Sequence, residues 1–224
     1  MALLSALMHG LRGRGGAALS SPCGARPKPA PFGTVIGIAP CGVPAYSSHY
    51  ASASLREKLL NLKHKNGGVY YGIRWQCVEF ARRWLITARG MTFGDVDMAY
   101  QIFELQHATR LTDKAKVAFD CVPNGSTRER ARPAFGSVLI WNEGGMFKWT
   151  GHVAIVTEVG DQFVRVAEQN VTDAPWEGRN WSRQLTVTVD PSSGAFTIHE
   201  PAPRSSIRGW MNISAANPDE EIAH

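Results

Sequence analysis

Residues 74–85 read RWQCVEFARRWL, and this stretch predicts an amphipathic helix that begins at a cysteine. At about 100° per residue, Phe80 and Trp84 lie within about 60° of Cys77 and form an apolar stripe with it. The spacing continues to a glycine, which is typical of a helix end, so we expect a helix over 77–89. Free cysteine is often a core residue, but the first turn of a helix favours an anion and therefore a thiolate. Cys77 is thus a candidate nucleophile, with a buried core residue as the alternative.

The stretch TGHVAIVTEVGDQFVRVAEQN, at 150–170, predicts a β-hairpin that turns at Gly-Asp-Gln. If the numbers of paired residues add to an even total, His152, Glu168 and Asn170 lie on one face of the hairpin. Glu168 or Asn170 can then accept a hydrogen bond from Nδ1 of His152 and leave Nε2 for a thiol. A register shifted by one residue would separate the histidine from both. A histidine in a strand is more often structural, so the neighbouring carboxylate and amide are what favour catalysis.

The overall composition excludes several classes of function. The chain has 224 residues, room for one domain, and a net charge of +5 that is spread along the sequence. No basic helix or aromatic RNA-binding motif accompanies this charge, so no nucleic-acid partner is expected. No apolar run reaches the ~20 residues of a bilayer span, so no membrane partner is expected either. The cysteines show neither metal spacing nor a disulfide framework, which predicts reduced thiols, no metal, no cofactor and a cytoplasmic location. They are Cys23, Cys41, Cys77 and Cys121.

The chain divides into three segments by composition. Residues 1–31 contain no acidic residue and end in a Pro-rich run. This composition is typical of a mitochondrial transit peptide or of a disordered extension, and both readings stay open. Residues 32–213 are predicted to form the domain, and residues 214–224 a polar tail.

Short patterns predict the rest of the secondary structure. We expect an irregular arm over 32–50, a short polar helix over 55–65, and a second helix over about 95–107 with Asp95 as its N-cap. Helices followed by an antiparallel sheet predict an α+β domain. The strands are predicted at 137–141, 152–159, 163–169, 184–189, 195–199 and 207–213.

Several longer pieces resemble a known family. In chain order they are FGTVIGIAPCGVPAYSS, WQCVEFARR, PNGS, LIWNEGG, TGHVAIVT, VRVAEQN and GWM. They resemble the CHAP superfamily (cysteine, histidine-dependent amidohydrolases/peptidases), and more closely the amidase domains of glutathionylspermidine synthetase/amidases and trypanothione synthetases. The resemblance covers Phe32 to about Met211. It implies a papain-like fold in which N-terminal helices, one of them carrying the cysteine, pack on an antiparallel sheet.

The resemblance also implies roles for individual residues. Cys77 would be the nucleophile and His152 the general base and then the general acid. Glu168 would be the third member of the site, with Asn170 close by. Gln76 would help the backbone N–H of the nucleophile to stabilise an oxyanion.

One further residue, Arg82, matches an arginine that the family uses in substrate binding. The helical wheel places it off the apolar stripe, so a solvated charge is the alternative. The implied activity is hydrolysis, through a thioester, of the amide that joins glutathione to spermidine. Two alternatives stay open: a peptidoglycan-type peptide hydrolase such as a D-alanyl-glycyl endopeptidase, and a non-catalytic CHAP binding module. The implied ligand is a glutathione–polyamine conjugate or a short peptide.

Overall fold

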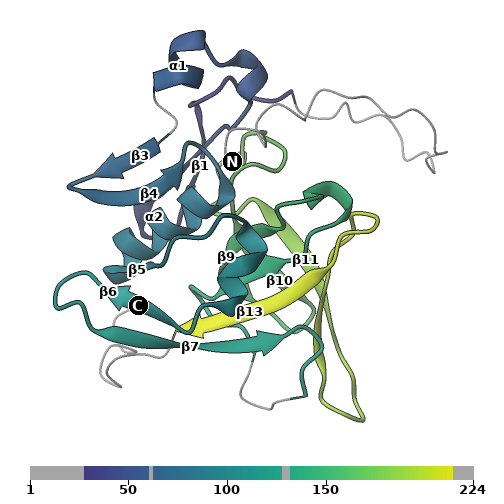
Figure 1. Ribbon diagram of the computed structural model, residues 1–224. Coiled ribbons are helices and arrows are strands. Elements are labelled where there is room, and N and C mark those ends of the chain that lie inside the picture. The colour runs from purple at the N-terminus through teal and green to yellow at the C-terminus, as the bar shows by residue number, and fades with distance from the viewer. Residues whose placement is uncertain (1–27, 61–62, 128–131, 214–224) are drawn as a thin grey trace.

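A long helix and a large antiparallel sheet make this an α+β protein, as the order of the predicted elements indicates (Figure 1). The computed structural model describes residues 28–60, 63–127 and 132–213. The large sheet contains β5 (Met91–Phe93), β6 (His107–Arg110), β7 (Lys116–Pro123), β8 (Val138–Trp141), β9 (His152–Val159), β10 (Phe163–Ala167), β11 (Arg183–Val189), β12 (Phe196–His199) and β13 (Ile207–Ile213). From edge to edge their order is β12-β11-β10-β9-β8-β13-β7-β6-β5.

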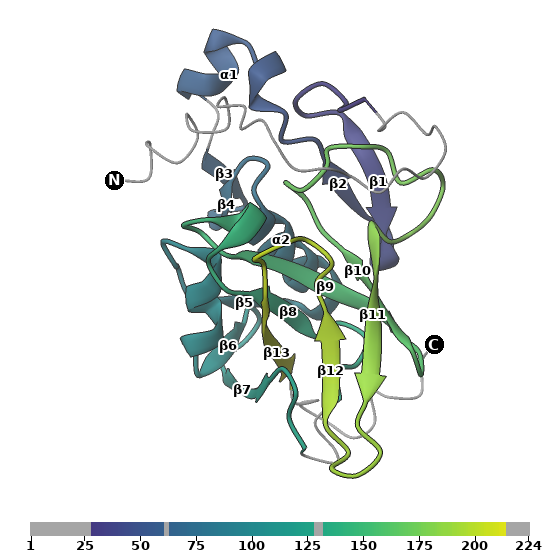
Figure 2. The ribbon, with the colours of Figure 1, turned by 90° about the vertical axis from the view of Figure 1, so that its right-hand side faces the viewer.

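Two small hairpins and two α-helices precede or flank this sheet. The hairpins are β1 (Val35–Ala39) with β2 (Val43–Tyr46), and β3 (Lys63–Asn66) with β4 (Val69–Ile73). The helices are α1 (Leu55–Leu60) and α2 (Cys77–Arg89). Figure 2 shows the segment between β10 and β11 beside β1, where Trp176 N–H donates to the carbonyl of Ile36 at 2.7 Å.

Helix α2 spans the residues that its apolar spacing predicts. It ends at Gly90, whose φ of 61° lies in the left-handed region that favours glycine. Phe80 and Trp84 are fully buried in one core with Val153 and Ile155 of β9. The helix therefore covers one face of the central hairpin.

The other face of the central strands forms a second core. Ala154 and Val156 alternate along β9 with the residues that face α2, so they point to the opposite side. There they join buried residues of β10, β11 and β12 such as Val166, Leu185 and Ile198. Both faces of β9 are thus buried, and only the strand ends can open onto a site.

Two of the N-terminal predictions were wrong. The arm at 32–50 is not irregular, because β1 and β2 pair across a turn in which Cys41 and Gly42 take positive φ. The polar helix at 55–65 ends at Leu60, and the chain turns back as β3 and β4. The signal for that hairpin is the Asn66-Gly67-Gly68 turn, since two successive positive-φ residues join tightly paired strands.

The predicted helix at 95–107 was also wrong. This segment contains a 3₁₀ helix, η4 (Ala99–Glu104), and β6 begins at His107. Asp95 does not cap a helix, because its carboxylate lies 3.2 Å from the Arg82 guanidinium. The start of η4 is instead fixed from outside, by hydrogen bonds from the N–H groups of Ala99 and Tyr100 to the carbonyl of Thr150. Tertiary contacts therefore override the helical spacing.

The hairpin of β9 and β10 contains a β-bulge. Val164 pairs with Val159 near the turn, one step away from the predicted register. Farther along, Val166 pairs with Val156, so Thr157 is the extra residue on β9. The bulge restores the even register, and His152 and Glu168 consequently lie on the same face.

Some of the predictions fall outside the described residues. The targeting or disordered extension falls there over residues 1–27, and the polar tail falls there entirely. Ala30, just before the predicted domain, donates its N–H to the carbonyl of Asp173 at 2.9 Å. Among the helices that the structure describes, none has the length and apolar character needed to cross a membrane.

Candidate active site

Cys77 is the first residue of α2, and its side chain is buried. The first hydrogen bond of the helix runs from the N–H of Phe80 to the carbonyl of Gln76. The N–H of Cys77 therefore precedes this bond and has no acceptor within the helix. Backbone N–H groups and the helix dipole at this end both stabilise negative charge. The thiol thus lies where a thiolate is favoured.

His152, the first residue of β9, is the partner of this thiol. Its Nε2 lies 2.8 Å from Oε2 of Glu168, and Cys77 is the other neighbour that acts on the ring and raises its pKa. Since Nε2 is occupied by the carboxylate, Nδ1 is the nitrogen left to exchange a proton with the thiol. The structure brings the three predicted residues together, but the sequence analysis assigned the two ring nitrogens the wrong way round.

Two aromatic rings fix the orientation of the histidine. Phe147 stacks on the imidazole, with ring centroids 4.6 Å apart and planes inclined by 6°. Trp141 meets it edge-on, with centroids 5.2 Å apart. The exposed fraction of His152 is 1%. The ring is therefore held in one orientation and shielded from water.

The surroundings of His152 favour its protonated form. Burial alone would lower the pKa of the ring, because it disfavours the charged form. The negative charge of a Cys77 thiolate and the hydrogen bonds with Cys77 and Glu168 outweigh burial and raise the pKa of His152 to about 9. The imidazole thus carries a proton at neutral pH and can stabilise a thiolate.

Glu168 is held by groups that the sequence analysis missed. Oε1 accepts hydrogen bonds from Arg183 Nε at 2.6 Å and from Ser182 Oγ at 3.0 Å. Burial would raise the pKa of Glu168, but Arg183 and then His152 lower it to about 2. The carboxylate is therefore ionised at neutral pH.

Asn170 does not orient the histidine. Its Nδ2 donates to Oε1 of Gln76 at 2.5 Å, and its Oδ1 accepts from Ser48 Oγ at 2.8 Å. Gln76 Nε2 in turn donates to the hydroxyl of Tyr50 at 2.9 Å. Burial raises the pKa of Tyr50 to about 12, against the opposing hydrogen bond from Gln76. Asn170 and a neutral Tyr50 therefore fix the side-chain amide of Gln76, the residue directly before Cys77, and Glu168 alone of the two candidates hydrogen-bonds with His152.

Arg82 lies away from this cluster. Its guanidinium donates to the carbonyls of Tyr71 and Gly94, both at 2.9 Å, and covers the ring of Phe93 at 4.7 Å. Only 2% of the residue is exposed, so a solvated charge is wrong. Within the described residues, the hydrogen bonds and the ion pair of Arg82 connect α2 to β4 and to the segment after β5, and none of them involves Cys77 or His152.

A buried ionic network lies behind the start of α2. Glu79, in the first turn, is fully buried. Its carboxylate accepts from Arg83 Nε at 2.6 Å and Gln169 Nε2 at 3.0 Å, and lies 2.8 Å from His64 Nδ1. Gln169 follows Glu168 directly, and the two side chains bind different elements. Glu168 hydrogen-bonds with His152 of β9, and Gln169 hydrogen-bonds with Glu79 of α2.

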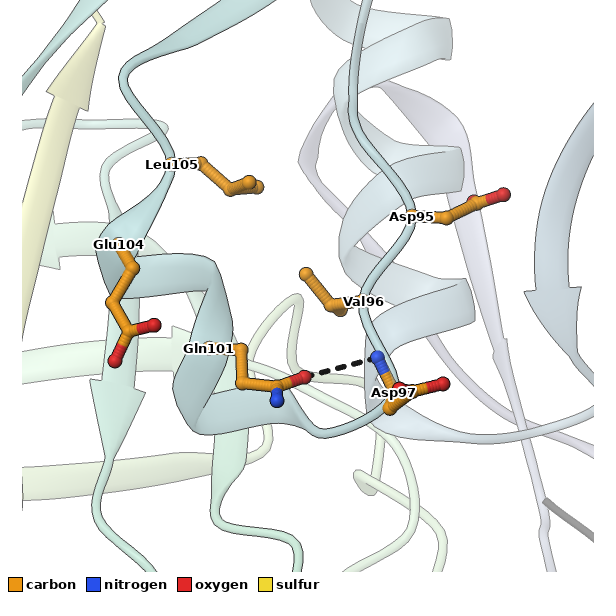
Figure 3. A pocket seen from close by; sticks show the side chains of 6 residues that line it. All are labelled: Asp95, Val96, Asp97, Gln101, Glu104 and Leu105. Carbon is orange, nitrogen blue, oxygen red and sulfur yellow. Dashed lines mark hydrogen bonds between the residues drawn. The ribbon is translucent and has the colours of Figure 1, made fainter. Parts of the chain in front are cut away.

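An open cavity of about 350 Å³ is lined by residues other than Cys77 and His152 (Figure 3). Its lining is acidic, but two of its carboxylates are already paired. Asp95 pairs with Arg82, and Glu104 pairs with Arg208 at 3.2 Å. These pairs hold the segment after β5 in place. The lining residues are Asp95, Val96, Asp97, Gln101, Glu104 and Leu105.

The described residues contain no group of three His, Cys, Asp or Glu side chains that could hold a metal ion. Cys41, Cys77 and Cys121 are free thiols.

A thiol at a helix start, an imidazole at a strand start and a buried carboxylate define a cysteine–histidine–glutamate site. Residues 67–170 match the CHAP domain, and this range contains all three side chains. The chain carries a CHAP domain.

Two curated relatives are similar to most of this chain. The bifunctional glutathionylspermidine synthetase/amidase of Escherichia coli is 41% identical over 201 residues, which cover 87% of this chain and 32% of that protein. The trypanothione synthetase of Crithidia fasciculata is 31% identical over 191 residues, which cover 84% of this chain and 28% of that protein. The chain thus spans about a third of the length of these relatives.

Proposed function

We propose that this chain is a cysteine amidohydrolase that cleaves the amide between glutathione and a polyamine such as spermidine. One observation carries the proposal: His152 hydrogen-bonds with Glu168 and interacts with Cys77 strongly enough for Cys77 to raise its pKa, in a chain 41% identical to a glutathionylspermidine synthetase/amidase. The papain-like arrangement is part of the proposal. The shared core of α2 and β9 supports it, because this packing brings the helix start and the strand start together.

The first half of the reaction forms a thioester. The Cys77 thiolate attacks the carbonyl carbon of the amide, and the C=O electron pair moves to oxygen and forms an oxyanion. As the oxyanion collapses, the C–N bond breaks and Nδ1 of His152 gives its proton to the departing amine. The amine leaves, and the acyl group stays on sulfur.

The second half releases the acid. The now neutral His152 takes a proton from water, and the resulting hydroxide equivalent attacks the thioester carbon. The S–C bond breaks, Cys77 returns as a thiolate and His152 as an imidazolium. Glu168 keeps its charge throughout and holds Nε2 of the ring.

The substrate is tested with two amides. Purified protein is incubated with glutathionylspermidine or with a Gly-containing muropeptide, and the products are identified by mass spectrometry. Release of spermidine and glutathione is the expected result. Cleavage of the muropeptide alone would instead identify a peptide hydrolase, and cleavage of neither would identify a binding module; both outcomes contradict the proposal.

The Gln76 amide is expected to support the oxyanion. Its Nε2 carries two hydrogens, and the Tyr50 hydroxyl accepts only one of them. Gln76→Ala should lower kcat by about 10²-fold or more with little change in KM, because an oxyanion donor acts mainly in the transition state. Tyr50→Phe removes only the positioning contact and should have a smaller effect. Equal kcat in Gln76→Ala and the unsubstituted protein would remove the amide from the mechanism.

The activity should fall on the alkaline side as His152 loses its proton. The pKa of this ring, about 9, lies above its usual value of 6.5. The protonated form of His152 is therefore present at neutral pH and is lost as the pH rises through about 9. We expect kcat/KM, measured between pH 6 and 10.5, to decline with a midpoint near pH 9.

Glu168→Gln is the matched variant for this alkaline limb. It keeps the size of the side chain but removes the negative charge that helps to raise the pKa of His152. The alkaline midpoint should therefore move down by about 1 pH unit. A midpoint that stays in place would mean that another group titrates there.

A further inference from the structure

We infer that Arg183 is a positioning residue of this site: its Nε and Nη2 groups bind both oxygens of Glu168 and aim the carboxylate at Nε2 of His152. The inference rests on the proposed function of the same site. Arg183 is the first residue of β11 and acts through Glu168, because the side-chain hydrogen bonds of its guanidinium go to Glu168 and Glu200.

The carboxylate of Glu168 is fully occupied by hydrogen-bond donors. Its Oε1 accepts from Arg183 Nε and Ser182 Oγ, at 2.6 and 3.0 Å. Its Oε2 lies 2.8 Å from His152 Nε2 and accepts from Arg183 Nη2 at 3.0 Å. A carboxylate offers about four acceptor sites, so none is left over. Because Arg183 binds both oxygens, the plane of the carboxylate is fixed and only one oxygen can face the ring.

Arg183 is itself anchored by a second carboxylate. Its Nη1 donates to Oε2 of Glu200 at 3.0 Å, and Trp141 Nε1 donates to the same oxygen at 2.8 Å. The guanidinium carbon lies 5.4 Å from the centre of the Trp141 ring, which also meets His152 edge-on. These contacts close a loop that starts and ends at the imidazole. An arginine held this way is oriented as firmly as the histidine that it supports.

The charges along this line alternate in sign. From the thiol outward they are the thiolate of Cys77, the imidazolium of His152, Glu168, Arg183 and Glu200. Within the described residues, His152 from β9 and Arg183 from β11 are the ionisable groups in contact with Glu168. Cys77 and Glu200 lie one step beyond them.

Removal of Arg183 changes the protonation of Glu168. Only 2% of this residue is exposed, and a buried carboxylate that loses a cationic partner takes up a proton more readily. The pKa of Glu168 then rises from about 2 toward the working range. A protonated Glu168 supports the imidazolium less well, and the thiolate beside it becomes scarcer.

The test measures the thiolate of Cys77 directly. The rate of alkylation by iodoacetamide is followed between pH 3 and 9 through the tryptic peptide Trp75–Arg82, which contains this cysteine and no other. No amide substrate is present, so the result is independent of the proposed function. The acid limb is the fall in the alkylation rate at low pH. If the acid limb shifts in the variants as expected below, in a protein that hydrolyses no amide, the inference is supported while the amidase proposal fails.

Two variants separate the charge of Arg183 from its geometry. Arg183→Met removes both, and its acid limb should move up by about 1 pH unit or more. Arg183→Lys keeps the charge but supplies only a single point of attachment. Its acid limb should stay in place, while its rate at neutral pH should fall by roughly tenfold for the loss of one charge-assisted hydrogen bond.

Arg165→Met is the control for a general loss of positive charge. Arg165 pairs with exposed Glu158 on the neighbouring strand and should leave the alkylation profile unchanged. A profile of Arg183→Met that matches that of Arg165→Met overturns the inference. So does a lower melting temperature in both Arg183 variants without a change in limb or rate. If Arg183→Met does not fold, a neutral-pH rate in Arg183→Lys equal to that of the unsubstituted protein is sufficient to overturn it.

Discussion

Cys77→Ala should lower the rate of amide hydrolysis by about 10⁴-fold or more while the protein stays folded. The reason is chemical, since alanine offers no atom that can carry the acyl group between the two halves of the reaction. The side chain lost is small, so the core that contains Phe80 and Trp84 should persist. The measurement is spermidine release under initial-rate conditions, with near-UV circular dichroism as the check on folding.

Cys41→Ser is the matched control for this variant. Cys41 is exposed, lies in the β1–β2 turn, and is a free thiol like Cys77. Its replacement should leave hydrolysis unchanged. Activity that survives Cys77→Ala but disappears in Cys41→Ser would place the nucleophile in the turn and refute the site described above.

Glu79→Met should lower the free energy of unfolding by about 3–5 kcal/mol. The substitution leaves the Arg83 guanidinium, only 8% exposed, without the carboxylate that compensates its charge. It also takes away the acceptor of Gln169 Nε2. Urea denaturation at pH 7 measures the change.

Glu158→Met is the control for this loss of stability. Glu158 pairs with Arg165 at the surface, with 48% of its side chain exposed, and its removal should change the free energy of unfolding by less than about 1 kcal/mol. Equal changes in the two variants would contradict a structural role for the buried network. Burial would raise the pKa of Glu79, but His64 and Arg83 lower it below its usual value. The contribution of Glu79 to the free energy of unfolding is therefore present at neutral pH and is lost as the pH falls through this lowered pKa.

The parts of the fold that follow from local spacing could be predicted from the sequence. The α2 limits came from apolar residues one turn apart and from Gly90, and both signals lie within the helix itself. The side-by-side placement of His152 and Glu168 was predicted from alternation along two strands that are adjacent in sequence, but it depends on the bulge at Thr157, which alternation does not reveal. In both cases the contacts that decide the structure join near neighbours.

The other parts depend on contacts that cross long stretches of chain. Arg183 reaches Glu168 across 15 residues, and the loop between them carries no periodic pattern. Tyr50 meets Gln76 across 26 residues, from a segment that reads as irregular. The false helix at 95–107 arose because Met98, Ile102 and Leu105 have helical spacing, while hydrogen bonds to Thr150 set the backbone. Spacing alone does not contain this information.

The extra residue in β9 has a consequence for how such proteins can change in length. Thr157 separates two registers of β9 and β10: one between Thr157 and the turn, and another between Thr157 and His152. An insertion or deletion at the tip, around 160–162, leaves the acid and the imidazole facing each other. Loss of a single residue between 153 and 157 would remove the bulge and leave one continuous register, in which His152 and Glu168 still share a face. Loss of a second residue there would place them on opposite faces. Relatives that keep this chemistry should therefore vary in length at the tip and, within β9, by no more than the bulged residue.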